Sequence, residues 1–115
     1  MLLLQKQQTF ARLLSQLILW ANDQGYSITF GEVKRTKLQA LANAMIGKGI
    51  KNSLHLLSLA ADLNLFKHGI YLDRTEDHQP LGKYWESLST QDYKCCWGGR
   101  FGDGNHYSIE HEGRK

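Results

Sequence analysis

An alternating stretch near the middle of the chain constrains the fold more than any other feature. In residues 59–65 the odd positions hold Leu, Ala, Leu and Leu, whereas Asp62 and Asn64 occupy even positions. Successive side chains of a β-strand point to opposite faces of its sheet. The stretch therefore predicts a strand with one face on an apolar core and the other toward something polar. Asp62 lies on the polar face.

Helical spacing and strand alternation divide most of the remaining chain into short elements. Apolar positions in 10–21, 36–45 and 81–88 favour helices, and those in 26–30 and 106–111 favour strands. Helices mixed with strands in this way predict an α+β fold, with a small, mostly antiparallel sheet and flanking helices.

The length of the chain and its apolar runs limit its organisation. A chain of 115 residues has room for one domain, 1–115. Its longest apolar run is far shorter than the ~18 residues of a membrane span. Gln5 and Lys6 interrupt the apolar start before a signal-peptide core of about 7 residues forms. We therefore expect no membrane insertion and a protein made in the cytoplasm.

Charge and cysteine content exclude two classes of protein. Fourteen Lys and Arg against eleven Asp and Glu give a formal net charge of +3, which slightly favours polyanionic partners. No basic cluster or stripe stands out, so nucleic-acid binding is not predicted. Cys95 and Cys96 are adjacent, which strains a disulfide and leaves no second pair for a four-cysteine zinc site. We expect both cysteines to be reduced and partly buried.

Three side chains have the residue types of a metal site. His55 comes just before the strand that contains Asp62, and His106 lies on the polar parity of the last predicted strand. If these two strands are neighbours, two imidazoles and one carboxylate converge, a set that suits zinc with a fourth position open. Spacing alone leaves the ordinary alternatives open: solvated or hydrogen-bonded histidines, a solvent-facing aspartate, and a plain Gly-Asp-Gly turn at Asp103.

Two separated motifs resemble the signatures of the zinc D-alanyl-D-alanine peptidase family. The first, similar to Ser-x-His-x-x-Gly-x-Ala-x-Asp, is Ser53-x-His55-x-x-Ser58-x-Ala60-x-Asp62. The second is an acidic residue three positions before a histidine, here Asp103 and His106. Aspartate in the acidic position, together with the stretches 31–36 and 97–106, is similar to the phage endolysin branch, the L-alanyl-D-glutamate endopeptidases. The resemblance spans roughly residues 30–108 and implies a Hedgehog/DD-peptidase-like fold.

The resemblance also implies roles for individual residues. His55, Asp62 and His106 would be zinc ligands, and Asp103 the catalytic base. Arg35 lies where the family places an arginine that steadies the substrate or the developing oxyanion; the alternative is an ordinary surface charge before a helix.

The activity that the resemblance implies is hydrolysis of the L-Ala–D-Glu bond in the peptidoglycan stem peptide, by a zinc-activated water and an aspartate general base. We expect a monomer that is made in the host cytoplasm and reaches the cell wall after holin-mediated release. Two alternatives stay open: a D,D-carboxypeptidase or D,D-dipeptidase of the same family, and a non-catalytic, zinc-stabilised domain that binds the cell wall.

One position departs from the family pattern, because Ser58 stands where the family has glycine. Glycine there indicates either a positive φ or a close backbone approach. Serine is small enough for the second but poorly suited to the first, so we expect an intact but less stable site.

The remaining histidines and aromatics are predicted to be structural. We expect His68 in a hairpin turn, His111 near the charged C-terminus and His78 as a helix cap or at the rim of a cleft. Three aromatic residues are expected to wall the cleft or the core: Trp97, Phe101 and Tyr107.

Overall fold

The computed structural model describes residues 1–33 and 53–115. Its helices and strands are α1 (Leu3–Asp23), β1 (Tyr26–Phe30), β2 (Ala60–Lys67), β3 (Ile70–Leu72), α3 (Gln79–Ser87), β4 (Cys95–Trp97) and β5 (His106–Ile109). Short 3₁₀ helices lie at Leu54–Leu57 (η1), Thr75–His78 (η2) and Gly98–Phe101 (η3). The helix predicted over 36–45 and the candidate residue Arg35 lie outside the described residues.

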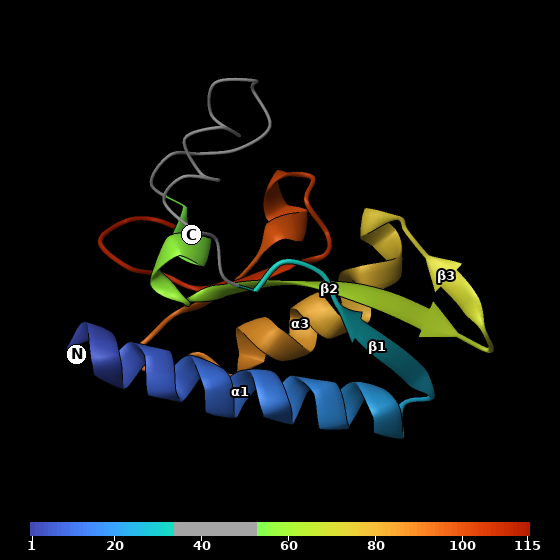
Figure 1. The fold of residues 1–115 in the computed structure, drawn as a ribbon, viewed down its shortest axis with the longest axis horizontal. Coiled ribbons are helices and arrows are strands. Elements are labelled where there is room, and N and C mark those ends of the chain that lie inside the picture. The colour runs from blue at the N-terminus through green and yellow to red at the C-terminus, as the bar shows by residue number, and fades with distance from the viewer. Residues whose placement is uncertain (34–52) are drawn as a thin grey trace.

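The strands form one antiparallel sheet in the order β1-β2-β5-β4, and β3 also pairs with β2. The first residues of β2 pair with β5, while its second half pairs with β1 and with β3. Figure 1 shows β2 running through the centre of the molecule, with α1 and α3 packed beside it. The predicted α+β class, with a small antiparallel sheet and helices, is confirmed.

The two faces of β2 differ as its alternation predicts. Leu63 and Leu65 on one face are fully buried, whereas Asp62 and Asn64 on the other are partly exposed. The buried face packs on apolar residues of the two helices: Phe10, Leu13, Leu14, Leu17 and Ala21 of α1, and Leu81 and Trp85 of α3. The opposite, polar face of the sheet is thereby left for the candidate site.

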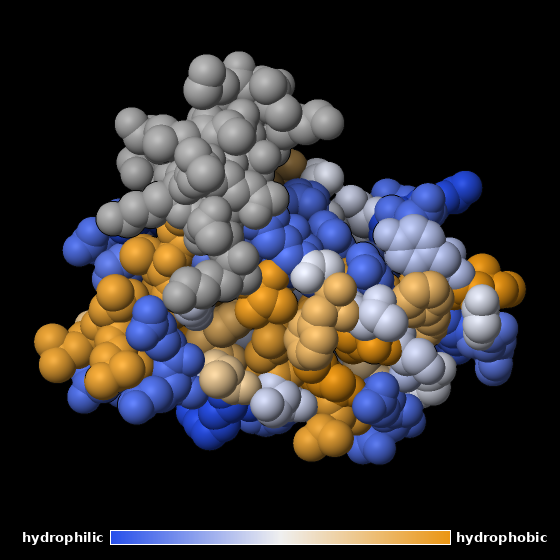
Figure 2. Space-filling model, viewed as in Figure 1, coloured by the Kyte–Doolittle hydropathy of each residue, from blue (hydrophilic) through white to orange (hydrophobic). Residues whose placement is uncertain are grey.

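Several elements differ in extent from the sequence prediction. α1 begins earlier than the predicted helix, at Leu3. Leu2 and Leu4 at this end of the chain are 72% and 63% exposed, and Figure 2 shows hydrophobic residues gathered on the surface at one end of the molecule. Phe30, predicted on the buried face of its strand, is 60% exposed. β4 was not predicted, because a three-residue strand is too short to show alternation. None of the helices that the structure describes is long and apolar enough for a membrane span.

Trp97 fixes the connection between β4 and β5 against α3. Its indole N–H donates a hydrogen bond to the carbonyl of Gly104 at 2.7 Å. A Cβ atom added at Gly82 of α3, or at Gly99 of η3, would overlap the indole ring. The ring therefore lies between two glycines and holds the loop that leads into β5.

We predict that Gly82→Ala destabilises the protein although alanine is the better helix former. Alanine in a helix gains about 1 kcal/mol over glycine, but forcing a methyl group into a packed site costs about 1–3 kcal/mol. The free energy of unfolding from urea denaturation should therefore fall by up to about 2 kcal/mol. The neighbouring exposed Lys83→Ala is the control and should change it by less than about 0.5 kcal/mol. A more stable Gly82→Ala protein would contradict the tight contact.

Candidate metal centre

The pairing of β2 with β5 brings two of the three candidate ligands together. Asp62 is the direct antiparallel partner of His106. Cross-strand partners place their Cβ atoms about 5 Å apart on one face of the sheet. Nδ1 of His106 lies 3.4 Å from Oδ1 of Asp62. The condition set by the sequence, that the two strands are neighbours, is met.

The third candidate ligand, His55, reaches the same point from η1. The Ser53 hydroxyl accepts a hydrogen bond from the backbone N–H of His55 at 3.2 Å, so Ser53 acts as the cap of this short helix. Ser58 ends the helix in the left-handed conformation, with φ 56° and ψ 39°. This reversal directs the chain into β2 and leaves Nε2 of His55 at 3.4 Å from Oδ1 of Asp62.

These three side chains form a cluster that can bind a metal ion. One potential ligand atom from each lies within 4.8 Å of the others. His55 is 3% and His106 7% exposed, yet Oδ1 of Asp62 and the second ring nitrogen of each histidine have no hydrogen-bond partner among the described residues. Buried polar atoms are normally satisfied. A cation at the centre of the cluster would satisfy the carboxylate oxygen.

The chemistry of the donors fits a transition metal. Two imidazole nitrogens and one carboxylate oxygen form a set that such ions accept, whereas calcium and magnesium prefer all-oxygen sites. Burial raises the pKa of Asp62, but the neighbouring His106 and His55 outweigh it and lower the pKa to about 2. The carboxylate is therefore ionised, as a metal ligand must be. Residues 34–52 contain no His, Cys, Asp or Glu that could add a ligand.

Two glycines leave the space that the cluster needs. A Cβ at Gly31 would lie 3.0 Å from the carbonyl oxygen and 3.3 Å from the Cβ of Asp62. A Cβ at Gly98 would overlap the carbonyl of Asp103 and lie 2.6 Å from the Cβ of His106. Larger residues at either position would therefore displace the strand or the loop that holds a ligand.

The loop between β4 and β5 places Asp103 beside the cluster but not in it. The Asp103 N–H donates to Gly98, and the Asp103 carbonyl accepts from the His106 N–H at 3.1 Å. Burial raises the pKa of the Asp103 carboxyl; His106 and His55 oppose this, and the charge of Asp62 adds to it. A carboxyl group that responds to all three cluster residues is within electrostatic reach of them.

His78 makes a contact in the core that the sequence does not predict. Its ring is 3% exposed, and Nδ1 lies 2.8 Å from the hydroxyl of Tyr107 in the core. Burial lowers the pKa of His78, although Asp77 opposes this. His78 occupies the N-cap position of α3, without a side-chain cap hydrogen bond, and it lines a cavity with Asp103, as the sequence predicts for a helix cap or a cleft rim. No spacing pattern could indicate the contact with Tyr107, because it depends on a strand distant in the sequence.

The other predicted structural residues are distributed as follows. His68 has a φ of 53° in the turn between β2 and β3. Nδ1 of His111 accepts a hydrogen bond from the Lys6 ammonium at 3.1 Å. Trp97 and Tyr107 are buried in the core, whereas Phe101 is 56% exposed with its ring centroid 6.0 Å from that of His106. Cys95 and Cys96 are free and buried.

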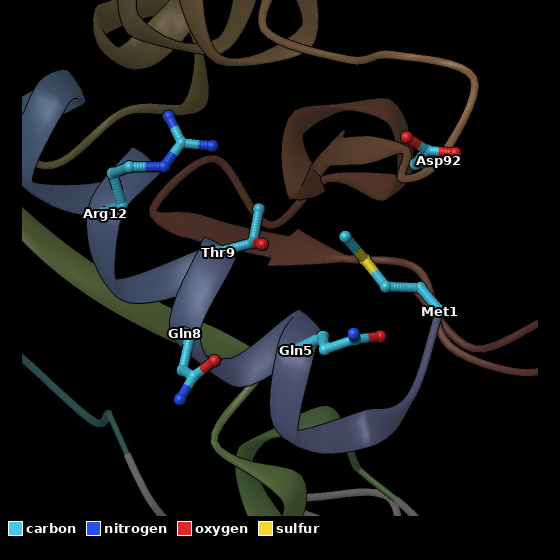
Figure 3. Close-up of a pocket in the computed structure, with 6 residues that line it drawn as sticks. All are labelled: Met1, Gln5, Gln8, Thr9, Arg12 and Asp92. Carbon is cyan, nitrogen blue, oxygen red and sulfur yellow. The ribbon is translucent and has the colours of Figure 1, made fainter.

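A larger cavity, of about 620 Å³, lies away from the cluster (Figure 3). It is formed by the first turns of α1 and the segment that precedes β4. Its charged lining residues are Arg12 and Asp92. Its lining has no residue of the cluster and no histidine or cysteine, so it does not compete with the cluster as the metal-binding site.

Comparison of the chain with protein-family models and with curated proteins finds no match. The cluster itself is a property of the folded chain, since its three residues are brought together by η1, β2 and β5.

We predict that Ser58→Gly stabilises the protein. A left-handed backbone at a residue with a Cβ destabilises the folded state by about 1–2 kcal/mol, and glycine removes this cost. The greater conformational freedom of glycine in the unfolded chain offsets about 0.5–1 kcal/mol of the gain. The free energy of unfolding should therefore rise by about 0.5–1 kcal/mol, measured by urea denaturation of the metal-free protein. The same replacement at Ser27, an exposed residue in β1 without a positive φ, should lower it. A loss of stability in Ser58→Gly would show that the hydroxyl matters more than the backbone strain.

Proposed function

We propose that this chain is a zinc metallopeptidase with a Hedgehog/DD-peptidase-like fold, which hydrolyses the L-Ala–D-Glu bond in the stem peptide of bacterial peptidoglycan. The observation that supports it is the convergence of His55, Asp62 and His106. These are the positions that correspond to zinc ligands in the peptidase family that the two sequence motifs resemble. A chance match of motifs has no reason to place all three side chains at one point.

The three cluster residues would hold the zinc ion through Nε2 of His55, Oδ1 of Asp62 and Nδ1 of His106, the atoms that face one another. Zinc would supply a Lewis acid that polarises a carbonyl group and lowers the pKa of a water molecule to about 7. Because each cluster residue offers one donor atom, further positions on the ion stay available to water and substrate.

Asp103 would move the proton in this reaction. Its carboxylate accepts a proton from the attacking water and afterwards donates it to the amine that leaves. A carboxyl group whose pKa is raised toward neutrality performs both tasks better than an ordinary one, and burial raises the pKa of Asp103. The adjacent Gly98 permits the tight loop that keeps this group next to His106.

The setting of the reaction follows from the same proposal. The enzyme acts as a monomer on the stem peptide, and the phage branch implies synthesis in the host cytoplasm and holin-mediated release to the wall. A D,D-carboxypeptidase would use the same cluster but release a terminal D-Ala, so product analysis separates the two activities.

We predict that the protein binds zinc through the cluster. Zinc at a free concentration about 100-fold above its Kd stabilises the folded state by about 2.7 kcal/mol, so the Tm should rise by several degrees. Bound metal is measured by elemental mass spectrometry. His55→Gln and His106→Gln should lose both the metal and the shift, while His68→Asn, in an exposed turn, should retain both. Full zinc binding by the two cluster variants would contradict the assignment.

We predict that Asp103→Asn retains zinc but loses turnover. General acid–base catalysis contributes about 10²–10⁴-fold to a rate, and asparagine cannot accept the proton. Purified peptidoglycan is digested, and the new termini are identified by mass spectrometry: wild-type protein should release C-terminal L-Ala and N-terminal D-Glu.

Asp92→Asn is the matched control for this experiment, because Asp92 is exposed and lies in the cavity away from the cluster. It should digest peptidoglycan as wild type does. Loss of zinc from Asp103→Asn would make Asp103 a ligand rather than a base, and release of free D-Ala would favour the carboxypeptidase. A zinc-loaded wild type that binds the wall without cutting it would favour the non-catalytic domain.

A further inference from the structure

A cavity of about 190 Å³ lies beside Asp103. It is lined by Tyr71, Asp73, Arg74, Thr75, His78 and the loop 102–105. A water molecule takes about 30 Å³ in the liquid, so the cavity is large enough for one small amino-acid residue. We call it the Arg74 cavity.

The role of Asp103 determines which part of a substrate would enter the Arg74 cavity. A group that gives its proton to the leaving amine must come within about 2.6–3.2 Å of that nitrogen. The residue that contributes the nitrogen must therefore lie against Asp103. Because Asp103 lines the Arg74 cavity, this residue would occupy the cavity.

The charged residues of the Arg74 cavity determine which charged group the bound substrate residue can have. Arg74 is exposed, and none of the ion pairs among the described residues involves it. Its backbone N–H donates to Oδ2 of Asp77 at 3.1 Å, which fixes the start of η2 at the cavity. Asp73 and Asp103 also line the cavity. Their negative charges would repel an anion that did not contact the guanidinium. A guanidinium binds a carboxylate through two parallel hydrogen bonds.

His78 adds a polar group to the lining of the Arg74 cavity. His78 is more than nine-tenths buried, and its Nδ1 atom lies 2.8 Å from the hydroxyl oxygen of Tyr107, within hydrogen-bond distance. Burial lowers the pKa of His78, which favours the neutral ring. When the phenol donates to Nδ1, the neutral ring has its proton on Nε2 and can donate a hydrogen bond.

We propose that the Arg74 cavity binds the residue whose amine leaves, and that Arg74 recognises a free α-carboxylate on it. This inference rests on the proposed function and narrows its substrate. In an ordinary internal peptide bond, the α-carbonyl of that residue belongs to the next amide and is uncharged. A free α-carboxylate beside the leaving nitrogen occurs in two cases: a D-Glu that continues through its γ-carboxyl group, and a C-terminal residue. The enzyme would therefore select stem peptides in one of these two forms.

The test compares peptides that differ in this carboxylate. Zinc-loaded protein is given acetyl-L-Ala-γ-D-Glu-L-Lys, the same peptide with the α-carboxylate amidated, and acetyl-L-Lys-D-Ala-D-Ala. Cleavage of the first peptide tests recognition of the α-carboxylate of an internal D-Glu. Cleavage of the third tests recognition of the α-carboxylate of a C-terminal residue. A charged hydrogen-bonded contact supports a preference of about tenfold or more in kcat/KM for the free carboxylate over the amide.

Variants of Arg74 test whether this residue causes the preference for the free carboxylate. Arg74→Gln should cleave both forms of the first peptide at similar rates, and Arg74→Lys should recover part of the preference. Arg12→Gln removes the same charge from α1, at the other cavity, and should leave the preference intact. Equal rates on the two forms in wild type, or a preference that survives in Arg74→Gln, overturns the inference.

A binding experiment separates failure of this inference from failure of the proposed function. If wild type cleaves none of the peptides, the proposed activity is wrong, and the cavity is tested by NMR titration with γ-D-glutamyl-L-lysine and its α-amide. Wild type should bind the free form about tenfold more tightly, and Arg74→Gln should bind both equally. Binding of both forms with the same affinity by wild type overturns the inference whatever the activity.

Discussion

The register between β2 and β5 is the constraint on which the candidate centre depends. Asp62 opposes His106 only in this register, and a slip of one residue would turn one of the two side chains into the core. The register is held by burial, because Ala61 and Tyr107, paired on the other face, are fully buried. The apolar core thus fixes the polar face, although the cluster and the core lie on opposite sides of the sheet.

Small residues next to the candidate metal centre leave room for the close backbone contacts that position its ligands. Gly31 allows the chain just after β1 to run beside Asp62, and Gly98 allows the chain to fold back tightly before His106. Trp97 then holds that loop on α3. Ser58 is the exception, since its left-handed backbone would suit glycine. The left-handed backbone of Ser58 therefore lowers the stability of the folded state at the turn between His55 and Asp62.

The sequence predicts the elements whose pattern repeats over enough residues. α1 and α3 follow from helical spacing, and β2 follows from alternation over 59–65. β4 is too short to show a pattern, and Phe30 is exposed although alternation places it on the buried face. Periodicity reports which face of an element a residue occupies. It does not report how far the neighbouring elements extend to cover that face.

For the site, the amino-acid pattern specifies the residue types and their faces: a carboxylate and an imidazole on the polar parity of two strands, and a second imidazole just before one of them. The folded chain adds three facts that no local pattern contains. β2 and β5 are neighbours, the turn at Ser58 brings His55 to Asp62, and Asp103 lines a cavity together with Arg74 and His78. Local patterns depend on a residue and its near neighbours, whereas a site depends on which distant segments the burial of apolar surface brings together.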